Sequence, residues 1–490
     1  MPRPPRSWLW GIAFGLLYWV GSARTAQWAD ASKLTLYALA GYAPSLNPGD
    51  HAGWTVLAWL WLRLFPGDPI GACHRLSALA AAVSLLLLVE LLRSRGEAPA
   101  AVRGAAAVWG VAHAPWWAAE LTETYAMATA LTLASLLAAA KGRAFLAGLG
   151  AGWAASCHGF TLFLTLPALV RGQGWLGKLA GLLVGTAPLW LALALQPPVD
   201  PLTDHHSAGL GSLRWHWDTF LAPSRLLTGM LLLLLLLLWN LGPLGWWGWL
   251  QGKTRSLVPS WTLLPLAILL AGYAPFRLHL MVGLLVLGLV LFRPPALPTP
   301  AAASHVVLQA LCYLGIPLAL TALNAENAFV RELPFRVNAV YFLNPMKGRE
   351  GSAELYAERF FAQAPERAVV LADFNPGAVL KLLQTVRGLR PDLTIIPTAV
   401  DNCLAAPQPA ACLATRIREV WQQGRPVVLA DTYEPYYRLQ ELRGQGITFQ
   451  PMEVGALVQP LSPREGNEKP TARSLGNTSP RVSPTSLFTP

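Results

Sequence analysis

Ionisable side chains follow directly on the first apolar segment of the chain. The stretch 27–54 contains Asp30, Lys33, Asp50 and His51, where a simple membrane anchor would carry an uncharged linker. An amphipathic pattern begins at Asp30, and we interpret this residue as a carboxylate held at the membrane interface, at the head of a helix. An N-cap role, in which the side chain only ends the linker, explains the same pattern equally well.

Three further ionisable residues lie at the ends of apolar segments. Glu120 and Glu123 are three positions apart, so on a helix they would share one face, beside Trp116 and Trp117. The alternative for this pair is a set of solvated acids in an interfacial aromatic belt. His158 lies between two apolar runs, where an ionisable group is a candidate functional residue. A buried histidine bonded to a backbone carbonyl is the alternative for this position.

The polar segment 196–225 carries arginines, histidines and tryptophans. Guanidinium groups bind phosphate through paired hydrogen bonds, so Arg214 and Arg225 are candidate phosphate ligands. The tryptophans between them would suit a lipid interface or the face of a sugar. The spacing around His205 and His206 does not indicate zinc, and nothing in the sequence requires a metal or a cofactor. The chain has no G-x-S-x-G, H-E-x-x-H or Walker motif.

The composition defines the elements that must position these residues. The 490-residue chain is 54% hydrophobic and only 13% charged, whereas a soluble domain is about 25% charged. These values indicate a polytopic α-helical membrane protein. The net charge of +11 comes from basic residues that stand singly between apolar segments. This distribution follows the positive-inside rule and argues against a nucleic-acid partner.

Apolar segments of about 20 residues can span a bilayer. We predict helices, some of them shorter than a full span, at 8–22, 76–92, 103–117, 124–140, 144–157, 159–170, 176–195, 227–250, 257–273, 277–292 and 304–323. The first of these resembles a signal peptide but lacks a clear cleavage site, so we expect it to be retained. Alternating spans place the basic loops on one side, which we assign as cytoplasmic. The acids, the histidines and all residues after about 324 then lie on the opposite side.

The character of the chain changes after residue 325, the expected end of the transmembrane domain. Val- and Ile-rich stretches in "RAVVLADF", "LTIIPTAV", "RPVVLADTY" and "ITFQPMEV" predict strands, and helical patterns lie between them. This alternation predicts a small parallel, Rossmann-like α/β domain at 334–462, without the glycine motif of a dinucleotide site. Residues 463–490 have the composition of a disordered tail. Cys403 and Cys412 could form a disulfide if this domain is extracytoplasmic, a point that the sequence leaves open.

Four motifs resemble a bacterial and animal family once called DUF2723, whose animal members are protein O-mannosyltransferases of the GT-C superfamily. Asp30-Ala31-Ser32-Lys33 resembles the family's Asp-Ser-Gly-Glu, and "HAGWTVLAWLWLRLF" keeps its His and its Arg-Leu-Phe. "WWAAELTETYAM" resembles the family's Trp and Ala-Glu-Val-Tyr-Ala-Leu and places Glu123 and Tyr125, while Ser156-Cys157-His158 resembles its Gly-Asn-His. Weaker likenesses at "SAGLGSLRWHW" and in the stretch that begins "PERAVVLADF" extend the resemblance to about residue 400.

The sequence departs from the family pattern at several of these places. Lys33 stands where the family has its second acid, and Cys157 replaces the Asn before the histidine. Both prolines of the family's His-Pro-Pro-Gly turn are missing after His51, and an insertion that includes "NPGD" lengthens the loop before it.

The resemblance implies a GT-C-like bundle, of about 11 helices by the segments above, with a C-terminal soluble α/β domain. The Pro-rich tail fits a bacterial inner-membrane protein. The resemblance also implies transfer of a sugar, mannose in the animal members, from a polyprenyl-phosphate donor to a protein or glycan hydroxyl on the extracytoplasmic face. Asp30 would be the general base. The expected substrate-binding residues are His51, Glu123, Tyr125, His158, Arg214, Arg225 and Lys33. The alternatives are a transporter, disfavoured because no internal repeat is found, and a non-enzymatic membrane assembly protein of the same fold.

Overall fold

The computed structural model describes residues 7–41, 51–195, 223–253, 258–277, 281–323, 325, 331–404 and 406–460. Up to residue 323 the regular elements in these ranges are helical: α1 (Ser7–Gly21), α2 (Asp30–Ala40), α3 (Ala52–Leu64), α4 (Pro69–Ser94), α5 (Pro99–Val111), α6 (His113–Glu120), α7 (Thr124–Ala140), α8 (Ala144–Cys157), the 3-10 turn η2 (Gly159–Thr161), α9 (Leu162–Val170), α10 (Trp175–Gly185), α11 (Ala187–Leu195), α13 (Pro223–Gln251), α14 (Ser260–Arg277), α15 (Val282–Phe292) and α16 (Thr299–Ala322).

Within the described ranges, three helices are long and apolar enough to cross a membrane, namely α4, α13 and α16. The pair α6 and α7 passes the same test as one broken span, with a bend of 115° between its halves. Other apolar helices, including α8, α10 and α15, are shorter than a full span. Each predicted apolar segment overlaps a described helix, but α2 and α3 lie outside the predicted segments. The sequence also did not show that α5 and α6 break at Ala112 or that α10 and α11 are separate.

Helices α8 and α10 approach each other closely because each carries glycines spaced four residues apart. A β-carbon at Gly148 would lie 1.9 Å from the carbonyl oxygen of Lys178, and one at Gly181 would lie 2.0 Å from that of Phe145. Such contacts leave no space for any side chain, so the two backbones touch directly. Small residues at this spacing are a common basis of helix association in lipid, where burial of apolar surface gives little driving force.

The C-terminal part contains a five-stranded sheet with the strand order β2-β1-β3-β5-β4. Its strands are β1 (Val369–Leu371), β2 (Thr394–Ile396), β3 (Val427–Leu429), β4 (Ile447–Pro451) and β5 (Ala456–Pro460), and its helices are α17 (Asn338–Leu343), α18 (Ser352–Gln363), α19 (Phe374–Arg387), α20 (Ala399–Leu404), α21 (Pro409–Gln422), α22 (Glu434–Tyr437) and α23 (Leu439–Arg443). The connections β1–α19–β2 and β2–α20–α21–β3 are parallel crossovers, with β2 and β3 on opposite sides of β1.

The prediction of a wholly parallel sheet was wrong. Strand β5 pairs with β3 and with β4 in antiparallel register, so the sheet is mixed. The four predicted strand segments coincide with β1 to β4, whereas β5 was missed. The predicted helix "EPYYRLQELRGQG" is broken into α22 and α23 at Arg438, whose φ of 50° interrupts the helix. The predicted tail at 463–490 lies outside the described residues.

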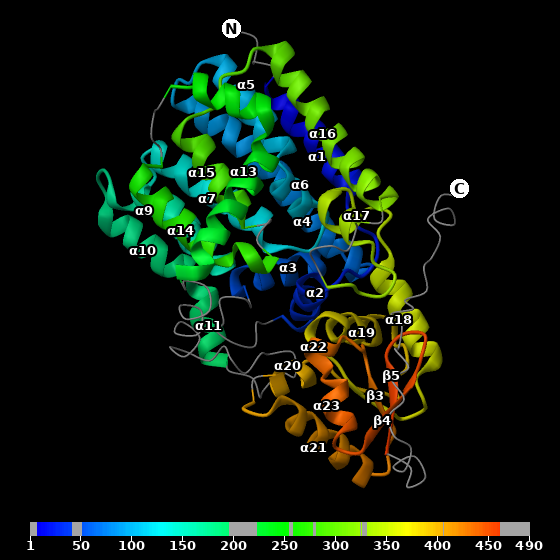
Figure 1. Ribbon diagram of the computed structural model, residues 1–490. Helices are drawn as coiled ribbons and strands as arrows, with labels where there is room; N and C mark the ends of the chain where they lie inside the picture. The colour runs from blue at the N-terminus through cyan, green and yellow to red at the C-terminus, as the bar shows by residue number, and fades with distance from the viewer. Residues whose placement is uncertain are drawn as a thin grey trace.

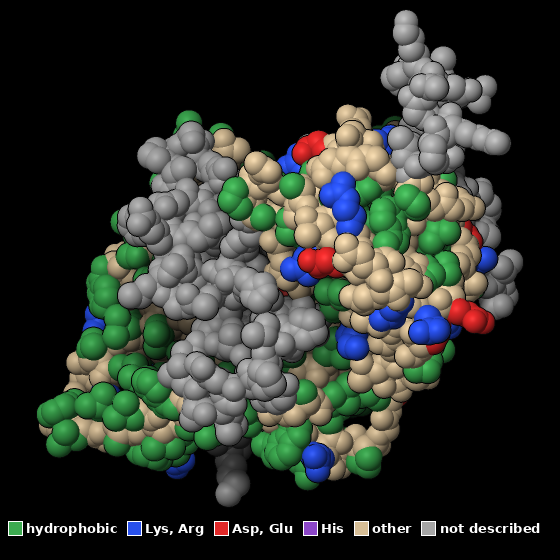
Figure 2. Space-filling view, turned by 90° about the horizontal axis from the view of Figure 1, so that it is seen from below, with side chains coloured by type: hydrophobic (Ala, Val, Ile, Leu, Met, Phe, Trp, Pro, Cys, Tyr) green, Lys and Arg blue, Asp and Glu red, His purple; other side chains and the backbone are tan. Residues whose placement is uncertain are grey.

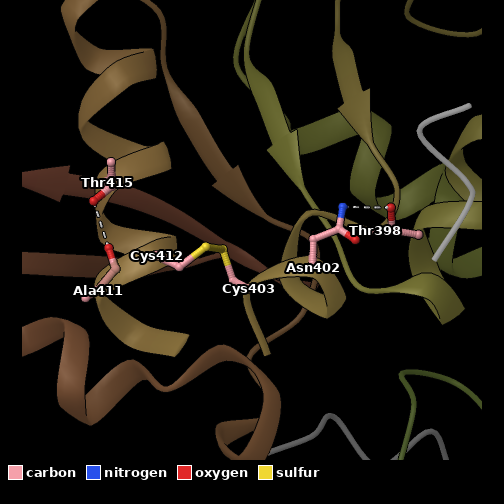
Figure 3. Close-up of a disulfide and its surroundings, with 6 residues drawn as sticks. All are labelled: Thr398, Asn402, Cys403, Ala411, Cys412 and Thr415. Carbon is pink, nitrogen blue, oxygen red and sulfur yellow. Dashed lines mark hydrogen bonds between the residues drawn. A yellow bond between two sulfur atoms is a disulfide. The ribbon is translucent and has the colours of Figure 1, made fainter. Parts of the chain in front are cut away.

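Cys403 and Cys412 form a disulfide that joins the end of α20 to the first turn of α21, as Figure 3 shows. Their α-carbons are 5.4 Å apart, a separation usual for this bond. Both helices are also held locally. Asn402 bonds to the Thr398 hydroxyl at 3.5 Å, and the Thr415 hydroxyl donates to the carbonyl of Ala411 at 2.9 Å. The pairing left open by the sequence is therefore present in this structure.

The sheet-containing part is packed tightly against the helical part through one shared apolar cluster. Trp28 and Trp117 from the helical part pack with Tyr356, Phe360 and Val370. In Figure 1, α2 and α3 lie between the remaining helices and the side of the sheet that carries α19 and α22. Figure 2 shows charged side chains over the sheet-containing part, and a mainly hydrophobic described surface on the side where α9 and α10 lie in Figure 1. That hydrophobic surface is suited to contact with lipid.

Candidate functional site

Asp30 is the first residue of α2, immediately after the loop that follows α1. The N-cap position of this helix is Ala29, and Asp30 lies inside its first turn, so the N-cap interpretation of Asp30 was wrong. A negative charge in the first turn is favoured by the partial positive charge of the helix N-terminus. The Asp30 side chain is 50% exposed, and a second molecule can therefore reach it.

Lys33 lies one turn further along α2 and pairs with Asp30, with 3.4 Å between Nζ and Oδ1. Its side chain is only 10% exposed. The ammonium group also lies 5.8 Å from the ring centre of Tyr37 and 5.4 Å from that of Phe374. A nearly buried cation beside a half-exposed carboxylate is a place where an added negative charge would be stabilised strongly.

His51 precedes α3 in a left-handed conformation, with φ of 52°. Its Nδ1 lies 2.6 Å from the carbonyl oxygen of Cys157. A carbonyl can only accept, so Nδ1 must carry the proton of this bond. Burial, followed by the charge of Lys33, lowers the pKa of His51 to about 4, so the ring is neutral at pH 7. The second nitrogen, Nε2, is then left with a lone pair that can accept a hydrogen bond.

His158 ends α8 and stacks on His51, with ring centres 5.6 Å apart. The ring of Tyr125 lies 5.0 Å from the same imidazole. The His158 side chain accepts from the backbone N–H of Phe160 at 3.4 Å, and it bonds to no backbone carbonyl among the described residues. These contacts bring α3, α7 and α8 together at one ring stack.

Glu123 lies in the break between α6 and α7, where the chain bends sharply. Ser77 on α4 makes two hydrogen bonds to its backbone. The Glu123 N–H donates to the Ser77 hydroxyl oxygen at 3.2 Å, and this hydroxyl donates to the Glu123 carbonyl oxygen at 3.2 Å. The side chain is buried and interacts electrostatically with both Asp30 and Lys33. The charge of Lys33 therefore acts on two carboxylates, Asp30 and Glu123.

Glu120 does not share a face with Glu123, contrary to the sequence-based prediction, because the two acids lie on opposite sides of the bend. Nor is either acid solvated, as the interfacial alternative required: Glu120 is fully buried and accepts from the indole N–H of Trp116 at 2.9 Å. The helical spacing rule failed here because residues 121–123 are not helical.

Of the two predicted phosphate ligands, Arg214 lies outside the described residues. Arg225 lies in the first turn of α13, and its side chain is not described. Among the residues that the structure describes, no group of three or more His, Cys, Asp or Glu side chains is arranged to hold a metal ion.

His74 was missed by the sequence analysis, although it holds the loops around the site together. Its Nε2 lies 3.0 Å from the carbonyl oxygen of Thr25, and its Nδ1 accepts from the backbone N–H of Thr122 at 2.8 Å. One nitrogen donates and the other accepts, so this ring is neutral in a single tautomer. It ties the loop before Asp30 to the loop before Glu123, and it could have been suspected from its place near the start of a long apolar helix.

A second missed group lies at the carboxyl ends of β1 and β3, the point at which the crossovers diverge. Arg331 donates to both carboxylate oxygens of Asp373, at 3.0 and 2.9 Å, and also bonds to Asp431. The rings of Tyr433 and Tyr436 flank the guanidinium at 4.6 and 4.8 Å. Open α/β sheets often bind ligands at such a divergence, but here the place is filled by the chain's own arginine.

The helices that are long and apolar enough to cross a membrane, the cluster of ionisable groups and the packed α/β part together indicate an integral membrane protein. The particular likeness is to ArnT from Cupriavidus metallidurans. Its apo structure superposes with a TM-score of 0.52 at 14% identity, covering 92% of this chain and 97% of that one. The same protein bound to undecaprenyl phosphate gives 0.49 at 14% identity, covering 93% and 98%. No protein-family model and no curated protein sequence matches the chain.

Proposed function

We propose that this protein is a membrane glycosyltransferase that moves a sugar from a polyprenyl-phosphate donor to a hydroxyl of a protein or glycan. The observation that carries the proposal is the ion pair of Asp30 and Lys33 inside the cluster formed with His51, Glu123 and His158. The shared fold supports it, because one ArnT structure contains undecaprenyl phosphate. A lipid-linked donor would also account for a polar site built directly onto apolar helices.

Asp30 acts as the general base in the proposed reaction. It removes the proton of the acceptor hydroxyl while that oxygen forms a bond to the anomeric carbon of the donor sugar. The bond between this carbon and the phosphate oxygen breaks, and the polyprenyl phosphate leaves with the electron pair. A positioned base contributes about 10²–10⁴-fold to the rate of such a step. The half-exposed carboxylate of Asp30 suits this role because the acceptor must reach it from outside.

The leaving phosphate gains negative charge in the same step, and Lys33 is the described cation placed to stabilise it. Preorganised charges of this kind act strongly because they need no rearrangement during the reaction. His51 would accept a hydrogen bond from a sugar hydroxyl through Nε2. Glu123, Tyr125 and His158 would fix the sugar against this ring. We include Arg214 and Arg225 as phosphate ligands on sequence grounds alone, and the reaction uses no cofactor apart from its lipid-linked donor.

We further propose that the site and the α/β domain at 334–462 face the extracytoplasmic side of a bacterial inner membrane. The Cys403–Cys412 disulfide supports this placement, because such bonds persist in oxidising compartments. A membrane-impermeant maleimide applied to intact cells after mild reduction tests it. Labelling of these two cysteines is expected, and labelling only after the cells are broken would reverse the orientation.

Sugar transfer in membranes tests the activity. A panel of radiolabelled polyprenyl-phosphate sugars, with mannose among them, would be offered to the wild type, Asp30→Asn and Glu358→Gln. Glu358 is an exposed acid on α18 and provides the matched acid-to-amide control. Transfer that survives in the control and collapses in Asp30→Asn would support the proposal. Equal transfer in all three proteins would move the base elsewhere, and no transfer by folded wild type from any donor would favour a transporter or an assembly protein.

A further inference from the structure

A basic cavity of about 480 Å³ lies at the end of the helices that is distant from the candidate site. Its lining includes the side chains of Arg95, Arg171 and Lys178, together with Gln173 and small residues of the turns between helices. The volume falls within the range of about 300–1,000 Å³ that is usual for ligand sites. The lining contains three cations and no acid, so the cavity is suited to an anion.

Helices α7 and α8 connect the basic cavity with the candidate site, because each has one end at the cavity and the other end at the site. Helix α7 begins beside Glu123 and ends at the cavity, and α8 runs from the cavity to Cys157, whose carbonyl binds His51. The 14 residues of α8 span about 21 Å. The basic cavity is therefore separate from the candidate site and lies at the opposite end of α8.

The two arginines are available to a ligand. Arg95 follows α4 and Arg171 follows α9, and both are exposed. Neither guanidinium has a hydrogen-bond or ion-pair partner among the described residues. Lys178 differs, because it is buried and its Nζ donates to the backbone carbonyls of Ala168 and Arg171, which fixes the shape of the turn. The nearby acid Glu90 is already paired with Lys141 at 3.2 Å.

Exposed apolar side chains stand close in sequence to the residues that line the cavity. Val170, Trp175 and Leu176 flank the turn that carries Arg171, and each is nearly two-thirds exposed. Leu146 on the first turns of α8 is also exposed. Trp is enriched where a membrane meets water. Cations inside the cavity and apolar side chains around it match the phosphate and the acyl chains of one molecule.

We propose that the basic cavity binds the phosphate headgroup of an anionic phospholipid, with the acyl chains lying along α9 and α10. The paired N–H groups of arginine suit a phosphate, and basic pockets between membrane helices are known to bind such headgroups. Helix α10 begins at Trp175, two residues after the lining residue Gln173, and its N-terminus adds partial positive charge. This site does not depend on the proposed transferase activity.

Native mass spectrometry of the purified protein, titrated with cardiolipin, phosphatidylglycerol or phosphatidylcholine, tests the proposal. The wild type would be compared with Arg95→Ala/Arg171→Ala and with the control Arg63→Ala/Lys253→Ala. The control removes the same charge from two exposed residues outside the cavity. We expect an anionic lipid to bind about 30-fold more weakly to the first variant, on the basis of about 1 kcal/mol per basic residue. The control is expected to change by less than about threefold.

Two other results would overturn the proposal. Equal losses in both variants would mean general attraction of anionic lipid to a basic surface, and equally tight binding of phosphatidylcholine would mean that charge is not recognised. Glycerol phosphate, added as a competitor, distinguishes a soluble phosphate from a lipid headgroup as the ligand. A variant with Arg95→Lys/Arg171→Lys, which keeps the charge, should retain most of the binding. The thermal midpoint of each variant in detergent verifies that it is folded.

Discussion

Lys33 lies one helical turn from Asp30, and its ammonium contacts both this carboxylate, at 3.4 Å, and the ring of Phe374, at 5.4 Å. Phe374 begins α19, so the α/β part closes over the side chain that pairs with the proposed base. The site is therefore completed by residues that are more than 340 positions apart in the sequence. Lys33 therefore contacts both the Asp30 carboxylate of the helical part and a ring of the α/β part.

Replacement of Lys33 by Met removes this charge and keeps the length of the side chain. We expect transfer to fall by about 10²-fold or more, because the growing charge on the leaving phosphate loses its nearest described cation. Lys33→Arg should retain part of the activity. Initial rates with separate determination of kcat and KM provide the measurement, and Lys381→Met on α19 is the control. A fall in Lys381→Met as large as that in Lys33→Met, or none in either, would contradict this role.

His51 allows its two ring nitrogens to be tested separately. His51→Asn keeps an N–H donor at the position of Nδ1 and tolerates the left-handed backbone that His51 adopts. His51→Ala removes the donor and leaves the carbonyl of Cys157 without a hydrogen bond from this side chain. The free energy of unfolding should fall by about 1–3 kcal/mol. We therefore expect His51→Asn to be nearly as stable as the wild type and His51→Ala to melt several degrees lower.

Both His51 variants lack the acceptor at Nε2, so both should transfer sugar poorly. Thermal midpoints in detergent and transfer rates in membranes separate the two effects. Full activity in His51→Asn would show that His51 only supports the backbone of Cys157 and does not bind the substrate.

Much of the local structure could be predicted from the sequence, because hydrophobic periodicity and strand composition are local signals. They located the apolar helices and β1 to β4, and the resemblance placed Asp30, His51, Glu123 and His158 in one site. The bend between Glu120 and Glu123 was missed, because the apolar pattern continues through both helices and does not show the angle at which they meet. The antiparallel β5 was also missed, because pairing depends on distant strands.

The groups that the sequence did not reveal depend on contacts between distant segments. Arg331 meets Asp373 and Asp431 only after the sheet has formed, and each residue alone is typical of a solvated surface. His74 lies in an apolar helix, where its two backbone partners come from different loops. No spacing rule connects such residues, so their roles become visible only in three dimensions.

The Arg331 cluster should stabilise the α/β part strongly. Burial raises the pKa of Asp431, and the two acids raise the pKa of Arg331 against the opposing effect of its own burial. Arg331→Met would leave two buried carboxylates without their cation, and we expect a loss of about 3–5 kcal/mol. Arg331→Lys should be intermediate, because an ammonium cannot reproduce the forked bonds.

Amide hydrogen exchange in β1 and β3 measures the loss of stability in the Arg331 variants. Arg331→Met/Asp373→Asn/Asp431→Asn is the informative companion, because it removes both buried charges together with their partner. Recovery of protection in this triple variant is expected. If Arg331→Met alone exchanges as slowly as the wild type, the cluster does not stabilise the sheet.

Lys347 should make the protein more stable as the pH rises above about 7. Its ammonium is buried after α17, where it donates to the carbonyls of Tyr341 and Asn344. Burial lowers the pKa of Lys347 from 10.5 to about 7, while Glu350 and Glu120 oppose this shift and Arg336 adds to it. Between these two pKa values the unfolded chain binds a proton that the folded protein has released. Stability attributable to Lys347 must therefore rise as the pH increases from 7 towards 10.5.

The thermal midpoint in detergent, measured from about pH 7 to about pH 9, tests this pH dependence. Relative to the wild type, Lys347→Met should show a smaller rise or a steeper fall across this range, because the linked proton is gone. Lys381→Met, which removes a lysine from α19, should follow the wild-type curve. Parallel curves for wild type and Lys347→Met would mean that Lys347 keeps its proton in the folded protein, held by Glu120 and Glu350. In that case the two acids, rather than burial, determine its charge.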